Sequence, residues 1–75
     1  MEKKDKLSMI FAGTTVVYRR GGDLEEGRCA GFRRNPATGD HRIHIRRSWH
    51  LEDDLLIDLD EVIGVRRRDG SLLEF

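Results

Sequence analysis

The chain has 75 residues, of which 37% are hydrophobic and 37% are charged, and its 14 lysines and arginines balance 14 aspartates and glutamates. A chain of this length forms one small domain, which excludes a two-domain enzyme with a cleft between its lobes. Zero net charge argues against a uniformly basic nucleic-acid coat and against an acidic disordered tail. Cys29 is the only cysteine, which excludes a disulfide-stapled secreted miniprotein, and we expect a cytoplasmic protein.

The first apolar residues predict a short helix. Leu7, Ile10 and Phe11 have the spacing of one helical face, and Gly13 ends the pattern. The apolar run is too short to span a bilayer, so we expect no membrane contact. Residues 1–12 are therefore assigned to a short helix or a flexible lead.

Two strands are predicted next. Residues 14–20 are β-branched and aromatic, Gly21 and Gly22 supply the positive φ angles of a tight turn, and residues 24–34 resume an extended pattern. These two strands are expected to be antiparallel neighbours. The composition of residues 35–40 predicts a loop.

The clearest strand signal lies at residues 41–47, where apolar and polar residues alternate. Ile43 and Ile45 share one face, which we expect to lie in the core. The opposite face carries Arg42, His44 and Arg46.

The last third of the chain predicts further strands. Residues 55–59 and 62–67 have the apolar content of strands, and a brief 3₁₀ turn is expected at residues 60–61 between them. In the second of these strands, Ile63 and Val65 are expected to share a face.

Asp69 and Gly70 predict a type I′ hairpin turn that leads into a final strand at residues 71–75. The whole pattern is mainly β, with a short N-terminal helix and five or six antiparallel strands. At this length a small SH3-like or Sm-like barrel would remove exposed sheet edges, so residues 13–75 are assigned to a single small β-barrel domain.

The segment 16–32 resembles the first half of the Sm/LSm motif. In that motif a turn glycine is followed five positions later by a second glycine, where a bent strand begins, and five positions beyond by a bulky apolar residue. Gly22, Gly27 and Phe32 stand at these positions. The resemblance implies a small barrel that begins with a short helix. Independently of the family, glycine at position 27 lets a long strand bend sharply.

The residues after Phe32 depart from the Sm proteins that grip uridine-rich RNA. Those proteins have an acidic residue after the apolar position, whereas Arg33 and Arg34 follow here, and their later Arg-Gly pair is missing from residues 63–68. The resemblance therefore implies the fold and not the uridine pocket. The shorter segment 57–62 is similar to a late strand of the bacterial Rho-binding antiterminator, an Sm-like regulator.

No set of residues typical of a catalytic centre is present, so we expect neither an enzyme, nor a cofactor, nor a small-molecule substrate. Cys29 is interpreted as a small buried thiol in a strand. Together with His41, His44 and His50 it could supply zinc ligands, but no paired spacing of a zinc site occurs, and no metal is predicted.

Arginines account for eleven of the fourteen basic residues, and they concentrate between residues 28 and 47. Arginine grips phosphates and stacks on bases, so a positive stripe beside an aromatic favours single-stranded nucleic acid. The alternatives are a solvated face whose arginines pair with carboxylates of the same chain, and a tryptophan that covers the core. The candidate nucleic-acid-binding residues are Arg33, Arg34, Arg42, His44, Arg46, Arg47 and Trp49.

The neutral total hides a charge asymmetry, because residues 1–50 carry a net charge of +5 and residues 51–75 one of −5. Segregated charge favours complementary contact with a protein partner or with a second copy of the chain. The candidate protein-interaction residues are Glu52, Asp53, Asp54 and Asp58.

Two functional hypotheses follow. The first is a non-enzymatic regulatory or adaptor barrel that binds a protein partner or itself. The second is a module that binds single-stranded RNA or DNA through the arginine-rich hairpin. The placement of the late acidic residues separates them: carboxylates against the arginine face favour the adaptor, and carboxylates on the opposite side favour nucleic acid.

Overall fold

A computed structural model describes residues 3–47 and 54–75, and it is mainly β. The chain begins with one short helix and continues through six strands, with a single 3₁₀ turn among the described residues. The elements are α1 (Lys3–Met9), β1 (Thr15–Arg20), β2 (Asp23–Arg34), β3 (His41–Arg46), β4 (Leu55–Asp58), η2 (Leu59–Glu61), β5 (Val62–Arg66) and β6 (Leu72–Glu74). The expected helix, strands, loop and 3₁₀ turn are therefore confirmed.

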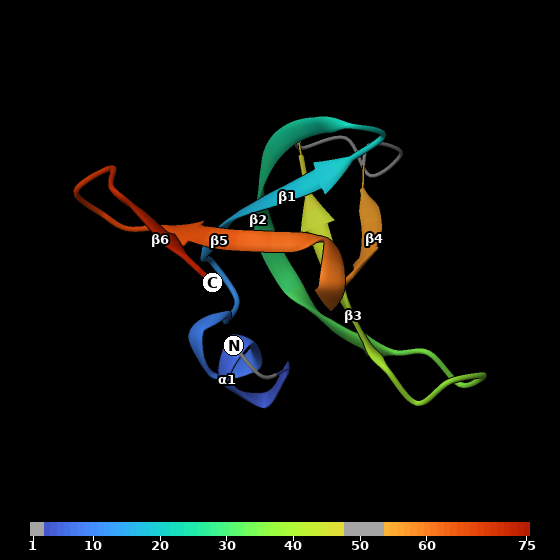
Figure 1. The fold of residues 1–75 in the computed structure, drawn as a ribbon. Coiled ribbons are helices and arrows are strands. Elements are labelled where there is room, and N and C mark those ends of the chain that lie inside the picture. Colours follow the sequence, from blue (N-terminus) through green and yellow to red (C-terminus); the bar gives the residue numbers. More distant parts are fainter. Residues whose placement is uncertain (1–2, 48–53) are drawn as a thin grey trace.

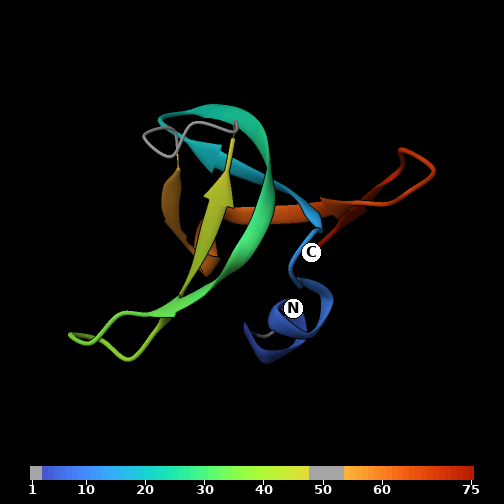
Figure 2. The ribbon, with the colours of Figure 1, turned by 180° about the vertical axis from the view of Figure 1, so that it is seen from behind.

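All six strands belong to one antiparallel sheet in the order β4-β3-β2-β1-β5-β6. The sheet curls around its core, and β2 sweeps across the back of the molecule (Figures 1 and 2). Within the described part of the chain, β4 and β6 do not pair with each other, so the sheet stays open at these two edges.

The long strand β2 serves two neighbours by bending at its middle. Residues 23–28 pair with β1, and the pairing with β3 starts at Arg28. Gly27 faces the core at this point, and a Cβ atom there would overlap the Cγ2 methyl of Ile45. The glycine is required for close approach of the two strands. A bulge between Cys29 and Gly31 adds a further irregularity, for which Gly31 adopts a φ of 145°.

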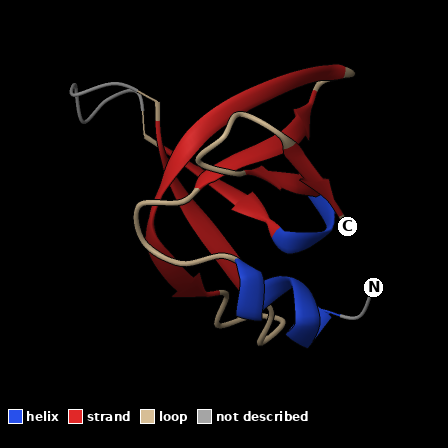
Figure 3. Cartoon of the chain, turned by 90° about the vertical axis from the view of Figure 1, so that its left-hand side faces the viewer, coloured by secondary structure: helices blue, strands red, loops and turns tan. Residues whose placement is uncertain are grey.

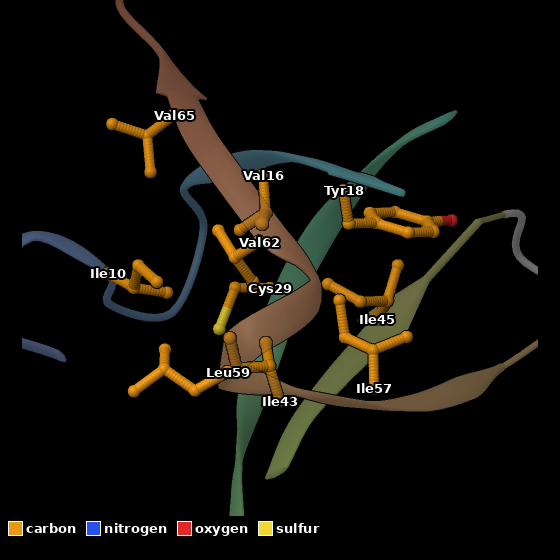
Figure 4. Packing of buried hydrophobic residues seen from close by; sticks show 10 residues of the cluster. All are labelled: Ile10, Val16, Tyr18, Cys29, Ile43, Ile45, Ile57, Leu59, Val62 and Val65. Atoms are coloured by element: carbon orange, nitrogen blue, oxygen red, sulfur yellow. The ribbon is translucent and has the colours of Figure 1, made fainter. Parts of the chain in front are cut away.

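The core lies inside the curl of the sheet (Figure 4). Ile43 and Ile45 are fully buried, as the alternation in β3 predicts. The buried cluster consists of Ile10, Val16, Tyr18, Cys29, Ile43, Ile45, Ile57, Leu59, Val62 and Val65. Ile10 joins it from the segment after α1, and α1 lies against η2 near one end of the sheet (Figure 3).

The prediction that Phe11 shares the buried face of the helix is wrong. The helix α1 ends at Met9, and Phe11 is 64% exposed instead of packing beside Ile10. The cause is a turn in which the Thr14 N–H donates to the Phe11 carbonyl at 2.9 Å, while the Gly13 N–H donates to Cys29 of β2 at 2.8 Å. These bonds anchor the backbone and leave the Phe11 ring in solvent.

Two expectations about β5 and its turn are also wrong. The register between β1 and β5 shifts at Ile63, so that Val62 and Val65 enter the core and Ile63 does not. A bulge of this kind inserts one residue and breaks the alternation. The following turn has only Gly70 at positive φ, so it is not type I′, which requires positive φ at Asp69 as well.

Candidate interaction surface on β3 and β4

The predicted stripe of basic residues is present on the outer face of β3. Arg42, His44 and Arg46 alternate with the buried isoleucines, so they project away from the core. The neighbouring strand β4 is antiparallel to β3 and aligns Asp58 with Arg42. This register brings acidic residues of the late segment directly beside the stripe.

Each member of the stripe has a carboxylate nearby. The Nε atom of Arg42 lies 3.4 Å from Oδ1 of Asp58, and the His44 imidazole shares a 2.8 Å hydrogen bond between Nε2 and Oδ2 of Asp54. The Nε atom of Arg46 lies 3.9 Å from Oδ1 of Asp54, a distance for attraction between charges but not for a hydrogen bond. The side chain of Asp54 is only 14% exposed. The carboxylates of Asp58 in β4 and of Asp54, just before β4, therefore offset the positive charge of the stripe.

Of the other candidate arginines, Arg33 lies on the same face as the stripe, and Arg34 and Arg47 lie elsewhere. Arg33 is the register partner of Arg42 and extends the stripe onto β2. It is exposed and makes no ion pair with a described residue. Arg34 is aligned with His41, and its guanidinium folds back over Gly39.

Arg47 follows β3 and is directed to an acidic residue of β2. Its Nη1 atom lies 3.6 Å from Oε2 of Glu25, which also accepts a hydrogen bond of 3.1 Å from the Tyr18 hydroxyl. The remaining predicted site residues, Trp49, Glu52 and Asp53, lie outside the described residues, as does His50.

A further ion pair, which the sequence did not predict, crosses the sheet on its outer face. Arg66 of β5 pairs with Glu26 of β2, and β1 runs between these two strands. Val17 of β1 is aligned with Glu26 and is only 3% exposed although it points away from the core cluster. Arg66 is aligned with Thr15, so the pair crosses β1 diagonally between this threonine and the valine. No local sequence signal relates positions 26 and 66, because only the strand order places them together.

Exposed apolar side chains are a further feature that the pattern did not predict. Leu56 of β4 is aligned with His44 and is 48% exposed, so the outer face of β3 and β4 combines charge with an apolar side chain. Phe11 and Met9 are exposed at a separate location.

The expected buried thiol is confirmed. Cys29 is 1% exposed, its Sγ atom donates to the Gly31 carbonyl at 3.6 Å, and burial raises the pKa of the thiol. Among the described residues, no group of three or more histidines, cysteines or carboxylates is arranged to hold a metal ion. The seven-residue α1 is the longest helix that the structure describes and is far too short to cross a membrane.

The burial of Cys29 predicts strong protection from thiol reagents. At pH 8 the folded protein should react with a disulfide reagent at least about a hundredfold more slowly than the urea-unfolded chain, because the sulfur becomes accessible only when the core opens. Absorbance of the released thiolate measures both rates, and the single cysteine makes the signal specific to this site. Equal rates in the two states would contradict the packing described for β2.

Comparison with known proteins adds no relative to this description: no protein-family model, no curated protein and no solved structure matches the chain.

Proposed function

We propose that the chain is a non-enzymatic regulatory or adaptor module, a small Sm-like or SH3-like barrel that binds another protein chain, either a partner or a second copy of itself. The observation that carries this proposal is the placement of Asp54 and Asp58 against the basic stripe of β3. A stripe with its own counter-charges attracts phosphates weakly, because an incoming phosphate has to compete with the carboxylates already in place. A face of mixed charge suits a protein surface of complementary pattern.

The barrel type is supported by three features. The bent strand β2 pairs with both β1 and β3, which is the device that lets few strands curl around one core. A short helix precedes β1, as in the family that the segment 16–32 resembles. Gly22, Gly27 and Phe32 keep the spacing of that family.

Binding at a sheet edge is supported by the open ends of the sheet. In the described part of the chain β4 pairs only with β3, so its other side has backbone N–H and C=O groups without a strand partner. Such an edge can accept an extended segment of another chain as an additional strand. Leu56 adds exposed apolar surface, and Asp58 adds charge, at the same edge.

Sedimentation velocity at low and high salt tests the self-association part of this proposal. If copies associate through β4, replacing Leu56 by lysine should raise the dissociation constant at least about tenfold, because charged residues block strand addition. Leu24→Lys is the matched control, since Leu24 is 59% exposed on the distant start of β2. A monomer under all conditions would exclude self-association, and a monomer that binds single-stranded RNA would contradict the proposal as a whole.

The second candidate function is binding of single-stranded RNA or DNA. It is favoured by one observation, namely that Arg33 and Arg34 are exposed and form no ion pair with described residues. Two arginines at the end of a hairpin make a small phosphate-binding surface compared with the uninterrupted stripe that the sequence suggested. The adaptor function is therefore the better supported of the two.

A further inference from the structure

A groove lies away from β3 and β4, between the segment that joins α1 to β1 and the end of β5. It has a volume of about 540 Å³ and is lined by residues 9 and 11–15 on one side and residues 65–68 on the other. The turn between β5 and β6, to which Arg67 and Arg68 of the second wall belong, extends away from the body of the molecule (Figure 1). Grooves of this volume are within the range of ligand-binding sites.

The first wall presents apolar side chains that are held in solvent. Phe11 is 64% exposed and Met9 is 37% exposed. The backbone at Phe11 is fixed, because its carbonyl accepts from the Thr14 N–H at 2.9 Å and its own N–H donates to the Thr14 hydroxyl at 3.4 Å. Gly13 anchors the same turn to β2. An exposed aromatic ring on a fixed backbone loses little conformational freedom on binding, which makes it a favourable anchor point.

The second wall presents cations. Arg67 and Arg68 are exposed and form no ion pair with described residues. Arg66 already has partners within the chain, since it pairs with Glu26 and donates to the Gly70 carbonyl at 3.1 Å. Asp69, on the same turn, accepts hydrogen bonds from the N–H and hydroxyl of Ser71, which lower the pKa of its carboxyl, and the charge of Arg67 lowers it further. Neither guanidinium group is held in an ion pair or hydrogen bond with a described residue, so both can pair with an anionic ligand, although Asp69 offsets part of the charge of Arg67.

We propose that this groove binds an acidic segment of a partner protein, with an apolar side chain of that segment packed on Phe11 and Met9 and its carboxylates paired with Arg67 and Arg68. The inference rests on the proposed protein-binding function and adds to it a second binding site and the chemistry of its ligand. Charge complementarity selects an acidic segment, because the described rim of the groove has cations and its lining has no carboxylate. The bidentate fork of arginine suits carboxylates in particular.

A protein segment fits this groove better than single-stranded nucleic acid does. Nucleic acid needs cations that follow the backbone over several nucleotides and aromatic rings for successive bases. Here Phe11 is the one aromatic residue of the described lining, and the free cations lie together at one end. A peptide with one apolar side chain flanked by acidic residues can pack on the first wall and pair with the arginines of the second wall at the same time.

Selection from a random peptide library displayed on phage, with the 75-residue chain as bait, tests the proposal. The expected result is enrichment of peptides in which an aromatic or large aliphatic residue is flanked by Asp and Glu. For a synthetic peptide of the enriched sequence, Phe11→Ser and the pair Arg67→Glu with Arg68→Glu should each raise the dissociation constant at least about tenfold. Leu24→Lys, at the exposed start of β2, should leave it unchanged. Because Phe11 is mostly exposed, its variant should keep the wild-type circular dichroism spectrum and melting temperature.

Other outcomes overturn the inference. Enriched peptides without acidic residues, or peptides that bind the Phe11→Ser variant as tightly as the wild type, would show that the groove is not an acidic-segment site. If those peptides instead lose binding in Leu56→Lys, the proposed function stands and the groove inference fails. If no peptide is enriched, or if a short oligouridine binds and loses affinity in Phe11→Ser, the groove inference is contradicted, while the self-association part of the proposed function is decided separately by sedimentation velocity.

Discussion

Replacing Gly27 by alanine is expected to destabilise the fold by about 1–3 kcal/mol, the usual cost of forcing an extra carbon into a packed core. The added Cβ would overlap the Cγ2 methyl of Ile45, which is fully buried, so that a core side chain or the backbone of β2 has to shift. The total free energy of unfolding of a 75-residue domain is about 4–11 kcal/mol, so this is a large fraction of it. Urea denaturation followed by circular dichroism measures the change.

Two substitutions of Ile45 separate this overlap from a general loss of strand propensity. Ile45→Leu removes the Cγ2 methyl, so the cost of Gly27→Ala should fall by about 1 kcal/mol in that background. Ile45→Val keeps the Cγ2 methyl, and there the cost should be unchanged. If Gly27→Ala destabilises both Ile45 variants equally, the contact with the Ile45 methyl is not the reason that position 27 requires glycine.

Removing the carboxylates beside the basic stripe is expected to create affinity for nucleic acid. In the double variant Asp54→Asn with Asp58→Asn, the guanidinium groups of Arg42 and Arg46 lose their counter-charges while the geometry of β3 and β4 is kept. Binding of a fluorescently labelled single-stranded oligonucleotide at about 50 mM salt should then become saturable, with a dissociation constant at least about tenfold below the lower limit set by the wild type, and should weaken steeply as salt is added. Fluorescence anisotropy measures both effects.

A matched variant controls for the change in net charge alone. Asp23→Asn with Glu74→Gln also removes two negative charges, but at exposed positions on β2 and β6 and not beside β3. This control should bind the oligonucleotide little better than the wild type does. Equal gains in the two double variants would mean that overall charge governs binding and that the pairing between β3 and β4 does not.

Much of this fold could be predicted because its signals are local. The alternation around Ile43 and Ile45 predicts a half-buried strand, and the paired glycines after Arg20 predict a tight turn. The irregular positions could not be predicted in the same way. Ile63 looks like a core residue by alternation, and only its pairing with β1 shows the bulge that turns it aside.

The candidate site was predictable in its residues but not in its electrostatics. The alternation in β3 places Arg42 and His44 on one face, yet whether that face is basic or neutral depends on which strand lies next to it. The neighbour is β4, and the resulting contacts with Asp54 and Asp58 come from the strand order and register. Phe11 is a similar case, since its exposure is set by hydrogen bonds to Thr14 and by the anchoring of the turn to a distant strand.

The most direct test of the account is an anisotropy titration of the wild-type protein with a short single-stranded RNA at about 50 mM salt, where electrostatic binding is strong. Asp54 and Asp58 offset the positive charge of the hairpin within the molecule, so we expect no saturable binding. Binding that weakens steeply with salt and is lost when Arg42 and Arg46 are replaced by alanine would contradict this expectation, because the stripe would then be available to phosphates in the native protein.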